Sequence, residues 1–181
     1  MIIVAESWQA AALTSCLVAA LFYPLLTVLE RESWFSYLLV QKKQGEIKNS
    51  LLMLFFMFAA VTAVAWGIFG KPLIAATAIL MWGTGDAAAA LIGVPFGKHK
   101  VHLKPADGKK SWEGTAAMFL AALICGLAVF LLHSQFPFGT AVLPIFFGAA
   151  VGAVTELFSP SEYDTITVPS VILAVLLLFL V

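Results

Sequence analysis

Residues 73–94 read LIAATAILMWGTGDAAAALIGV, and this stretch decides the fold class. It contains a single charged side chain, Asp86, and about 20 apolar residues are enough for a helix to cross the hydrocarbon core of a bilayer. The stretch is therefore predicted to be a transmembrane helix that carries one carboxylate. An aspartate inside the membrane costs roughly 2.5–3.5 kcal/mol on insertion scales, so we expect it to face other helices or a wet cavity.

The composition of the whole chain agrees with this prediction. Of its 181 residues, 62% are hydrophobic and 11% are charged, whereas a soluble domain has about 25% charged residues. So few polar side chains cannot cover a water-facing surface, which excludes a soluble globular enzyme. Ten basic and ten acidic residues cancel, which argues against a nucleic-acid binder that relies on bulk positive charge. The sequence predicts one small integral membrane protein.

Cutting the chain at its charged residues predicts six membrane spans. They cover about 10–29, 50–69, 73–94, 115–132, 140–158 and 167–181, with a very short turn at Gly70–Lys71. The last span is short, and we expect Thr167 to be its N-cap and Pro169 to lie near its first turn. The predicted fold class is all-α, a polytopic membrane protein of about six transmembrane helices. It forms a single domain, residues 1–181.

The basic residues are distributed unevenly between the two faces that six spans create. Nine of the ten lysines and arginines fall in the segments 30–49 and 95–114, and Lys71 alone falls on the other face. By the positive-inside rule, the basic face is cytoplasmic and both termini lie outside. A polar cytoplasmic face on one side of a cell-membrane protein favours an enzyme that acts on lipid over a symmetric conduit.

Two acids in the predicted spans lie on helix faces made of small residues, where another helix can approach closely. The two faces comprise Gly83, Asp86, Ala90 and Gly93 on the third span, and Gly148, Gly152 and Glu156 on the fifth. Both acids also have a structural interpretation. Asp86 could pair with a nearby lysine for packing alone, and Glu156 could already lie at the membrane interface.

The loop over residues 97–114 is the most polar stretch of the chain. Lys109 and Lys110 precede Ser111, which is a natural N-cap for the helix that follows. Free N–H groups and the positive helix end attract anions, and two ammonium groups beside them suit a polyphosphate. The alternative is that these lysines only anchor the loop at the cytoplasmic surface.

The last cytoplasmic connection adds Glu162 and Asp164 on the same side as these lysines. Mg²⁺ takes one or two carboxylates together with substrate phosphates, so acids and lysines around one site suggest a metal–nucleotide complex.

Three motifs, in this order, resemble the core of the polyprenol kinase family, which includes phytol kinase, dolichol kinase and the CTP-dependent diacylglycerol kinase. They are Gly85-Asp86-Ala-Ala-Ala-Ala-Leu-Ile-Gly93, Phe96-Gly97-Lys98 and Lys109-Lys110-Ser111-Trp112-Glu113-Gly114. The same core also resembles phosphatidate cytidylyltransferase. The closing segment, Glu156 followed by Asp164-Thr-Ile-Thr-Val-Pro169, resembles that of the kinases, and the resemblance covers about residues 42–169.

The resemblance implies transfer of the terminal phosphate of a nucleoside triphosphate, typically CTP, to a membrane lipid alcohol, with Mg²⁺ or another divalent cation. The implied catalytic residues are Asp86, Lys110 and Glu156. The implied nucleotide-binding residues are Lys98, Lys109, Lys110, Ser111 and Gly114. The implied metal ligands are Asp86, Glu113 and Asp164. Which carboxylate is the base and which binds the metal stays open, as does CTP against ATP.

Two other functions remain as alternatives. A phosphatidate cytidylyltransferase would use the same nucleotide and metal but break a different bond. A small ion-coupled transporter could use Asp86 as its ion or proton site, although the chain has no inverted repeat and its charge is one-sided. The expected partners are a lipid alcohol and a nucleoside triphosphate, with no nucleic acid. The glycine faces would serve internal packing or a homodimer contact.

Overall fold

The computed structural model describes residues 6–29, 46–102, 110–133, 138–160 and 163–181. Its regular elements are all helical, and they are α1 (Trp8–Leu29), α3 (Glu46–Thr62), the π-helical η1 (Ala63–Ile68), α4 (Pro72–Phe96), α5 (Trp112–His133), α6 (Phe138–Phe158) and α7 (Asp164–Leu180). The one β pairing within the described residues is an isolated bridge between Lys100 and Ser111. The all-α prediction is confirmed.

Five helices are long and apolar enough to span a membrane, so the chain is an integral membrane protein. They are α1, the continuous α3–η1 helix, α4, α5 and α6. The helix α7 has 17 residues and is the shorter sixth element, as its sequence predicts. The predicted turn between the second and third spans is also confirmed, since Gly70 has a φ of 66°, a conformation that glycine adopts without strain.

The start of α7 differs from the prediction. The helix begins at Asp164, and the N–H groups of Ile166 and Thr167 already donate to the carbonyl of Tyr163. The Thr167 hydroxyl also donates to this carbonyl, over 3.0 Å, so Thr167 lies inside the first turns and is not the N-cap. Its threonine–proline pattern misled the prediction because Pro169 is accommodated within the helix.

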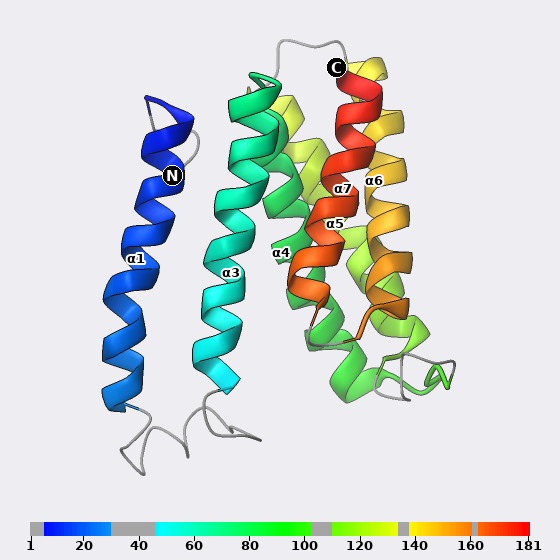
Figure 1. The fold of residues 1–181 in the computed structure, drawn as a ribbon. Helices are drawn as coiled ribbons and strands as arrows, with labels where there is room; N and C mark the ends of the chain where they lie inside the picture. Colours follow the sequence, from blue (N-terminus) through cyan, green and yellow to red (C-terminus); the bar gives the residue numbers. More distant parts are fainter. Residues whose placement is uncertain (1–5, 30–45, 103–109, 134–137, 161–162) are drawn as a thin grey trace.

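Figure 1 shows how the helices surround α4. This helix packs against α5, α7, α3 and α6, and α6 lies between α5 and α7. The helix α1 stands at one edge, mainly against α3. The core contains large side chains with almost no exposed area, and these include Met57, Met81, Met118, Ile145, Ile172 and Leu176.

Small residues let these helices approach closely, although not all of the predicted ones do so. A Cβ added to Gly152 would lie 2.8 Å from Ile172, which confirms the α6 face as a contact with α7. On α4, however, the contact with α5 runs through Gly85 and Gly93, and nothing lies within 4 Å of a Cβ added to Gly83. Predicting Gly83 as a packing residue was wrong, because the α5 contact lies on a neighbouring face of α4.

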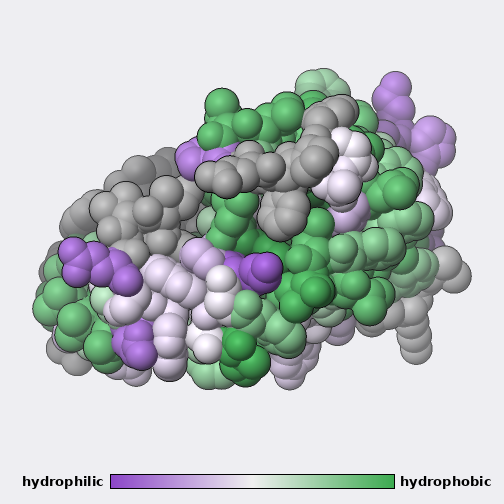
Figure 2. Space-filling view, turned by 90° about the horizontal axis from the view of Figure 1, so that it is seen from above, coloured by the Kyte–Doolittle hydropathy of each residue, from purple (hydrophilic) through white to green (hydrophobic). Residues whose placement is uncertain are grey.

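The two ends of the helix bundle differ in polarity. Alternating helix directions bring the ends of α4 and α6 together with the starts of α5 and α7 at the lower end in Figure 1. There α4 extends beyond the lower ends of α6 and α7, which leaves a step in the bundle. Figure 2 looks onto the opposite end, where hydrophobic side chains cover most of the described surface and hydrophilic ones form separate small groups.

Replacing Gly126 by alanine should destabilise the bundle. The new Cβ would lie 2.7 Å from Ile145 Cγ2 and 2.8 Å from Met81 Sδ in the packed core. Overpacking of this kind costs about 1–3 kcal/mol, more than the gain of about 1 kcal/mol in helix propensity. The measurement is thermal unfolding of the purified protein in detergent, where we expect a lower midpoint for Gly126→Ala. The control Gly83→Ala has open space around it and should unfold at or above the wild-type temperature. Equal midpoints for the two variants would contradict the described packing.

Candidate active site

A pocket of about 180 Å³ lies at the step in the bundle, where four helices contribute residues. Its polar lining combines carboxylates, an ammonium group and two hydroxyls, supplied by Asp86, Lys110, Ser111, Thr115, Glu156 and Asp164. The remaining lining comes from the small and apolar residues Ala89, Ala90, Gly93, Val94 and Gly114. Six of the predicted site residues line this one cavity, although they lie up to 78 positions apart in the sequence: Asp86, Lys110, Ser111, Gly114, Glu156 and Asp164.

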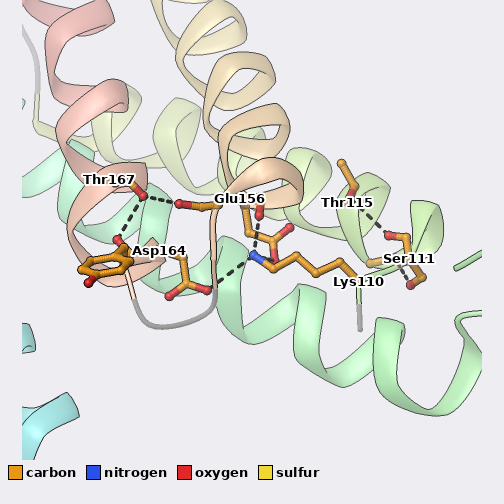
Figure 3. Close-up of polar contacts among 9 residues, drawn as sticks. Lys110, Ser111, Thr115, Glu156, Asp164 and Thr167 are labelled. Carbon is orange, nitrogen blue, oxygen red and sulfur yellow. Dashed lines mark hydrogen bonds and ion pairs between the residues drawn. The ribbon is translucent and has the colours of Figure 1, made fainter. Parts of the chain in front are cut away.

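Lys110 is the centre of the polar contacts (Figure 3). Its Nζ lies 3.0 Å from Oε1 of Glu156 and 3.5 Å from Oδ2 of Asp164, and it also donates to the backbone carbonyl of Glu156. An ammonium group has three donors, and these three contacts use all of them. The Lys110 and Glu156 side chains are only 10% and 11% exposed, so this is a nearly buried ion pair. Loss of one partner would leave the other charge buried and unpaired.

The backbone around Lys110 is held by the short pairing between Lys100 and Ser111. The N–H of Val101 donates to the Lys110 carbonyl over 2.9 Å, and the N–H of Trp112 donates to the carbonyl of His99 over 3.1 Å. These bonds fix the start of α5 against the end of α4. They orient Lys110 so that its side chain reaches the ends of α6 and α7.

Ser111 is the predicted N-cap of α5, and the structure confirms it. Its Oγ accepts a hydrogen bond from the N–H of Gly114 over 3.2 Å. The hydroxyl also lies among glycines, since a Cβ added to Gly97 would come within 2.5 Å of it and one added to Gly93 within 3.2 Å. Glycine at positions 93 and 97 of the motifs thus allows close packing, because the absence of a side chain lets the capped start of α5 lie directly against α4.

The N–H groups at the start of α5 are less available to an anion than the sequence predicts. The N–H of Trp112 donates to His99, and that of Gly114 donates to Ser111. What remains for an anion near this end is the positive pole of the helix dipole.

Asp86 lies on α4 with its side chain exposed at the pocket. It forms no hydrogen bond or ion pair with another residue in the described part of the chain, but the charges of Asp164, Glu156 and Lys110 act on it. The pocket lining holds three carboxylates and one ammonium group, so its formal charge is negative. A cation bound there would relieve the repulsion among the acids.

Two of the described site predictions, Glu113 and Lys98, do not line this pocket. Glu113 is turned away, because its carboxylate accepts hydrogen bonds from His99, with Nδ1 at 2.6 Å and the backbone N at 3.1 Å. Lys98 is exposed and does not line the cavity. Lys109 lies outside the described residues, as does Glu162.

The prediction missed two groups of polar contacts. Thr115 lines the pocket and donates to the Ser111 carbonyl over 3.2 Å. The Ser159 and Thr167 hydroxyls lie 2.7 Å apart and tie the connection after α6 to α7. The i, i+4 spacing of Ser111 and Thr115 could have indicated the first contact. Nothing in the sequence pairs Ser159 with Thr167.

The donor set suits a metal that shares its coordination with a ligand. Within the described ranges, no group of three or more His, Cys, Asp or Glu side chains is close enough to enclose a metal ion. Mg²⁺ is usually bound through one or two carboxylates plus substrate phosphates and waters, which does not require such a group. The residues present therefore fit Mg²⁺ bound together with phosphates.

Comparison with known proteins agrees with the motifs. The chain is 37% identical over 101 residues to a phytol kinase from Synechocystis sp., and the match covers 55% of this chain and 42% of that relative. The chain thus spans less than half the length of the curated relative it matches. No protein-family model matches the sequence, and no solved structure matches it. The similarity to phytol kinase confirms the resemblance to the polyprenol kinase family.

Proposed function

We propose that this protein is a lipid kinase, which transfers the γ-phosphate of a nucleoside triphosphate to the hydroxyl of a membrane lipid alcohol. The observation that carries the proposal is the convergence of Asp86, Lys110, Glu156 and Asp164 on one pocket at the ends of membrane-spanning helices. The similarity to phytol kinase supports the same reaction class, with an isoprenoid-type alcohol as acceptor. CTP as donor and Mg²⁺ as cofactor follow from the motif resemblance.

The position of the pocket suits an acceptor that is itself anchored in the membrane. Asp86 lies on the membrane-spanning helix α4. After Asp86, this helix continues for ten residues, or about 15 Å at 1.5 Å per residue. Its exposed carboxylate lies at the step where α6 ends and α7 begins. A lipid hydroxyl near headgroup depth could reach this level from the bilayer, while a nucleotide would enter from water. We place this end of the protein in the cytoplasm, where the basic segments predict it to be.

In the proposed reaction, the acceptor oxygen attacks the γ-phosphorus. The bond from that phosphorus to the β–γ bridging oxygen breaks, and the nucleoside diphosphate leaves. We assign Asp86 to orienting the acceptor hydroxyl and accepting its proton, because this carboxylate is exposed at the cavity and has no partner among the described residues. Phosphoryl transfer otherwise depends on positioning and charge neutralisation.

The ion pairs of Lys110 suggest a role different from direct phosphate binding. By holding one oxygen of Glu156 and one of Asp164, Lys110 orients both carboxylates at the pocket. The second oxygen of each acid lies outside these contacts with Lys110, and we propose that these two oxygens are candidate ligands for Mg²⁺. The chemistry that Mg²⁺ would supply there is positive charge to offset the negative charge of the phosphates. Lys109, next in the chain, is then the candidate to approach the phosphates.

Labelled nucleotide distinguishes this reaction from its closest alternative. Membranes containing the protein are incubated with Mg²⁺, a panel of lipid alcohols and phosphatidate, and CTP labelled at either the α or the γ phosphate. We expect lipid-bound label from the γ position only, because a kinase breaks the β–γ linkage. Label from the α position would instead establish cytidylyl transfer, and no label with any lipid would contradict both enzyme functions.

Asp86→Asn should reduce phosphate transfer by at least about 100-fold, since the amide cannot accept the acceptor's proton. The readout is initial rate in detergent, with thermal unfolding measured on the same sample to show that the fold is retained. The control is Glu6→Gln, because Glu6 is an exposed acid at the end of the helix bundle opposite the pocket. This variant should keep the transfer rate within about 2-fold of the wild-type rate. Full activity in Asp86→Asn would refute the assignment of this residue.

Removal of divalent cations should stop the reaction. In the purified protein, excess EDTA is expected to lower the transfer rate to background, and excess Mg²⁺ should restore it, whereas added K⁺ should not. The physical reason is that carboxylates outnumber ammonium groups in the pocket. In the absence of a bound cation, this negative charge would repel a triphosphate. Transfer that continues unchanged in EDTA would show that the acids have another role.

A further inference from the structure

We propose that a second cavity, the apolar groove between α3 and α7, binds the hydrocarbon chain of the acceptor alcohol. This inference rests on the proposed kinase function and adds the site that recognises the acceptor's chain. The groove has a volume of about 250 Å³. It lies within the part of the bundle that spans the membrane.

The chemistry of the groove suits a hydrocarbon. Nine of the ten residues that line it are apolar, and the exception is the hydroxyl of Ser170. Small side chains on both helices leave the space for the groove. They are Ala60 on α3 and both Ser170 and Ala174 on α7. Buried Val61 and Leu173 form part of its wall. An apolar chain gains free energy by filling such a surface, at about 25 cal/mol per Å².

The dimensions suit one chain of lipid length. The α7 side of the groove runs from Ile166 to Leu177, eleven residues or about 16 Å of helix. This is close to half of the roughly 30 Å hydrocarbon core, the depth that one lipid chain occupies in its leaflet.

The groove begins at the level of the candidate active site. Ile166, at its lower end, is two residues from Asp164, which lines the polar pocket. These two residues project from different sides of the first turn of α7, so an acceptor would pass around the start of this helix to reach Asp86. The residues that line the groove come from α3, η1 and α7, so the helix that the two cavities share is α7, which carries both Ile166 and Asp164. A chain lying in the groove with its hydroxyl at the lower end would place that hydroxyl at the start of α7, the helix that also carries Asp164.

Filling the groove should change which alcohols react. The variants Ala60→Leu and Ala174→Leu are compared with wild type on geraniol and on the longer geranylgeraniol, and kcat/KM is measured for each. We expect about a 10-fold or greater loss on the longer alcohol, which must lie along the groove, and less than about a 2-fold loss on the short one. The control Ala128→Leu enlarges an exposed alanine on α5 outside the groove and should change neither value. Equal effects on both alcohols in the groove variants would overturn the proposal.

A binding experiment tests the groove independently of catalysis. Wild type and both groove variants, with folding checked by thermal unfolding, are irradiated with a geranylgeraniol analogue that carries a diazirine in its chain. Labelled peptides are then identified by mass spectrometry. We expect labels on α3 and α7 in wild type and at least about a 5-fold weaker signal in Ala174→Leu. Labels elsewhere, or equal labelling of the variant, would refute the groove as the chain site, even if the protein transfers phosphate. A wild type that is labelled in the groove but transfers no phosphate would support the groove and contradict the kinase function.

Discussion

The arrangement of the lower end of the bundle depends on one nearly buried ammonium group. Lys110 connects the start of α5 to the end of α6 and the start of α7, and it is the only described cation in a pocket with three carboxylates. Charges of one sign repel strongly where water is scarce. Without this lysine, the ends of α6 and α7 would present two unpaired acids to each other and to Asp86. The same contacts that hold the helices together thus also orient the acids proposed to act in phosphoryl transfer.

The helical architecture could be predicted from the sequence because the bilayer imposes length and polarity on each span. Apolar runs of about 20 residues and the charges between them identified every helix, and Gly70 identified the tightest turn. The boundaries were less predictable. The start of α7 was placed near Thr167 because Pro169 suggests a first turn, yet the hydrogen bonds to Tyr163 begin the helix at Asp164. Pro169 lies within the helix and so does not mark its first turn.

The membership of the candidate site was predicted in part, whereas its contacts were not predicted. The sequence indicated that Asp86, Lys110, Glu156 and Asp164 would meet, because intramembrane and loop charges on one side of a membrane protein have few places to gather. The sequence could not show that the Lys110 ammonium group pairs with two acids, since that depends on how α5, α6 and α7 pack. Nor could it separate Glu113 from the other acids, because its partner His99 comes from a pairing that residue patterns do not reveal. The small residues of the groove between α3 and α7 were equally hidden, as they lie more than a hundred positions apart.

The bridge between Lys100 and Ser111 has a consequence for how such a protein can diversify. Because the backbone of Lys100 and Val101 pairs with that of Lys110 and Ser111, insertions or deletions between Val101 and Lys110 need not displace Lys110 or the helix that starts after it. The sequence between them can therefore change in length or composition while the geometry of the Lys110 pocket stays constant. The bridge thus separates a segment whose length can vary from a helix start whose position the pocket requires.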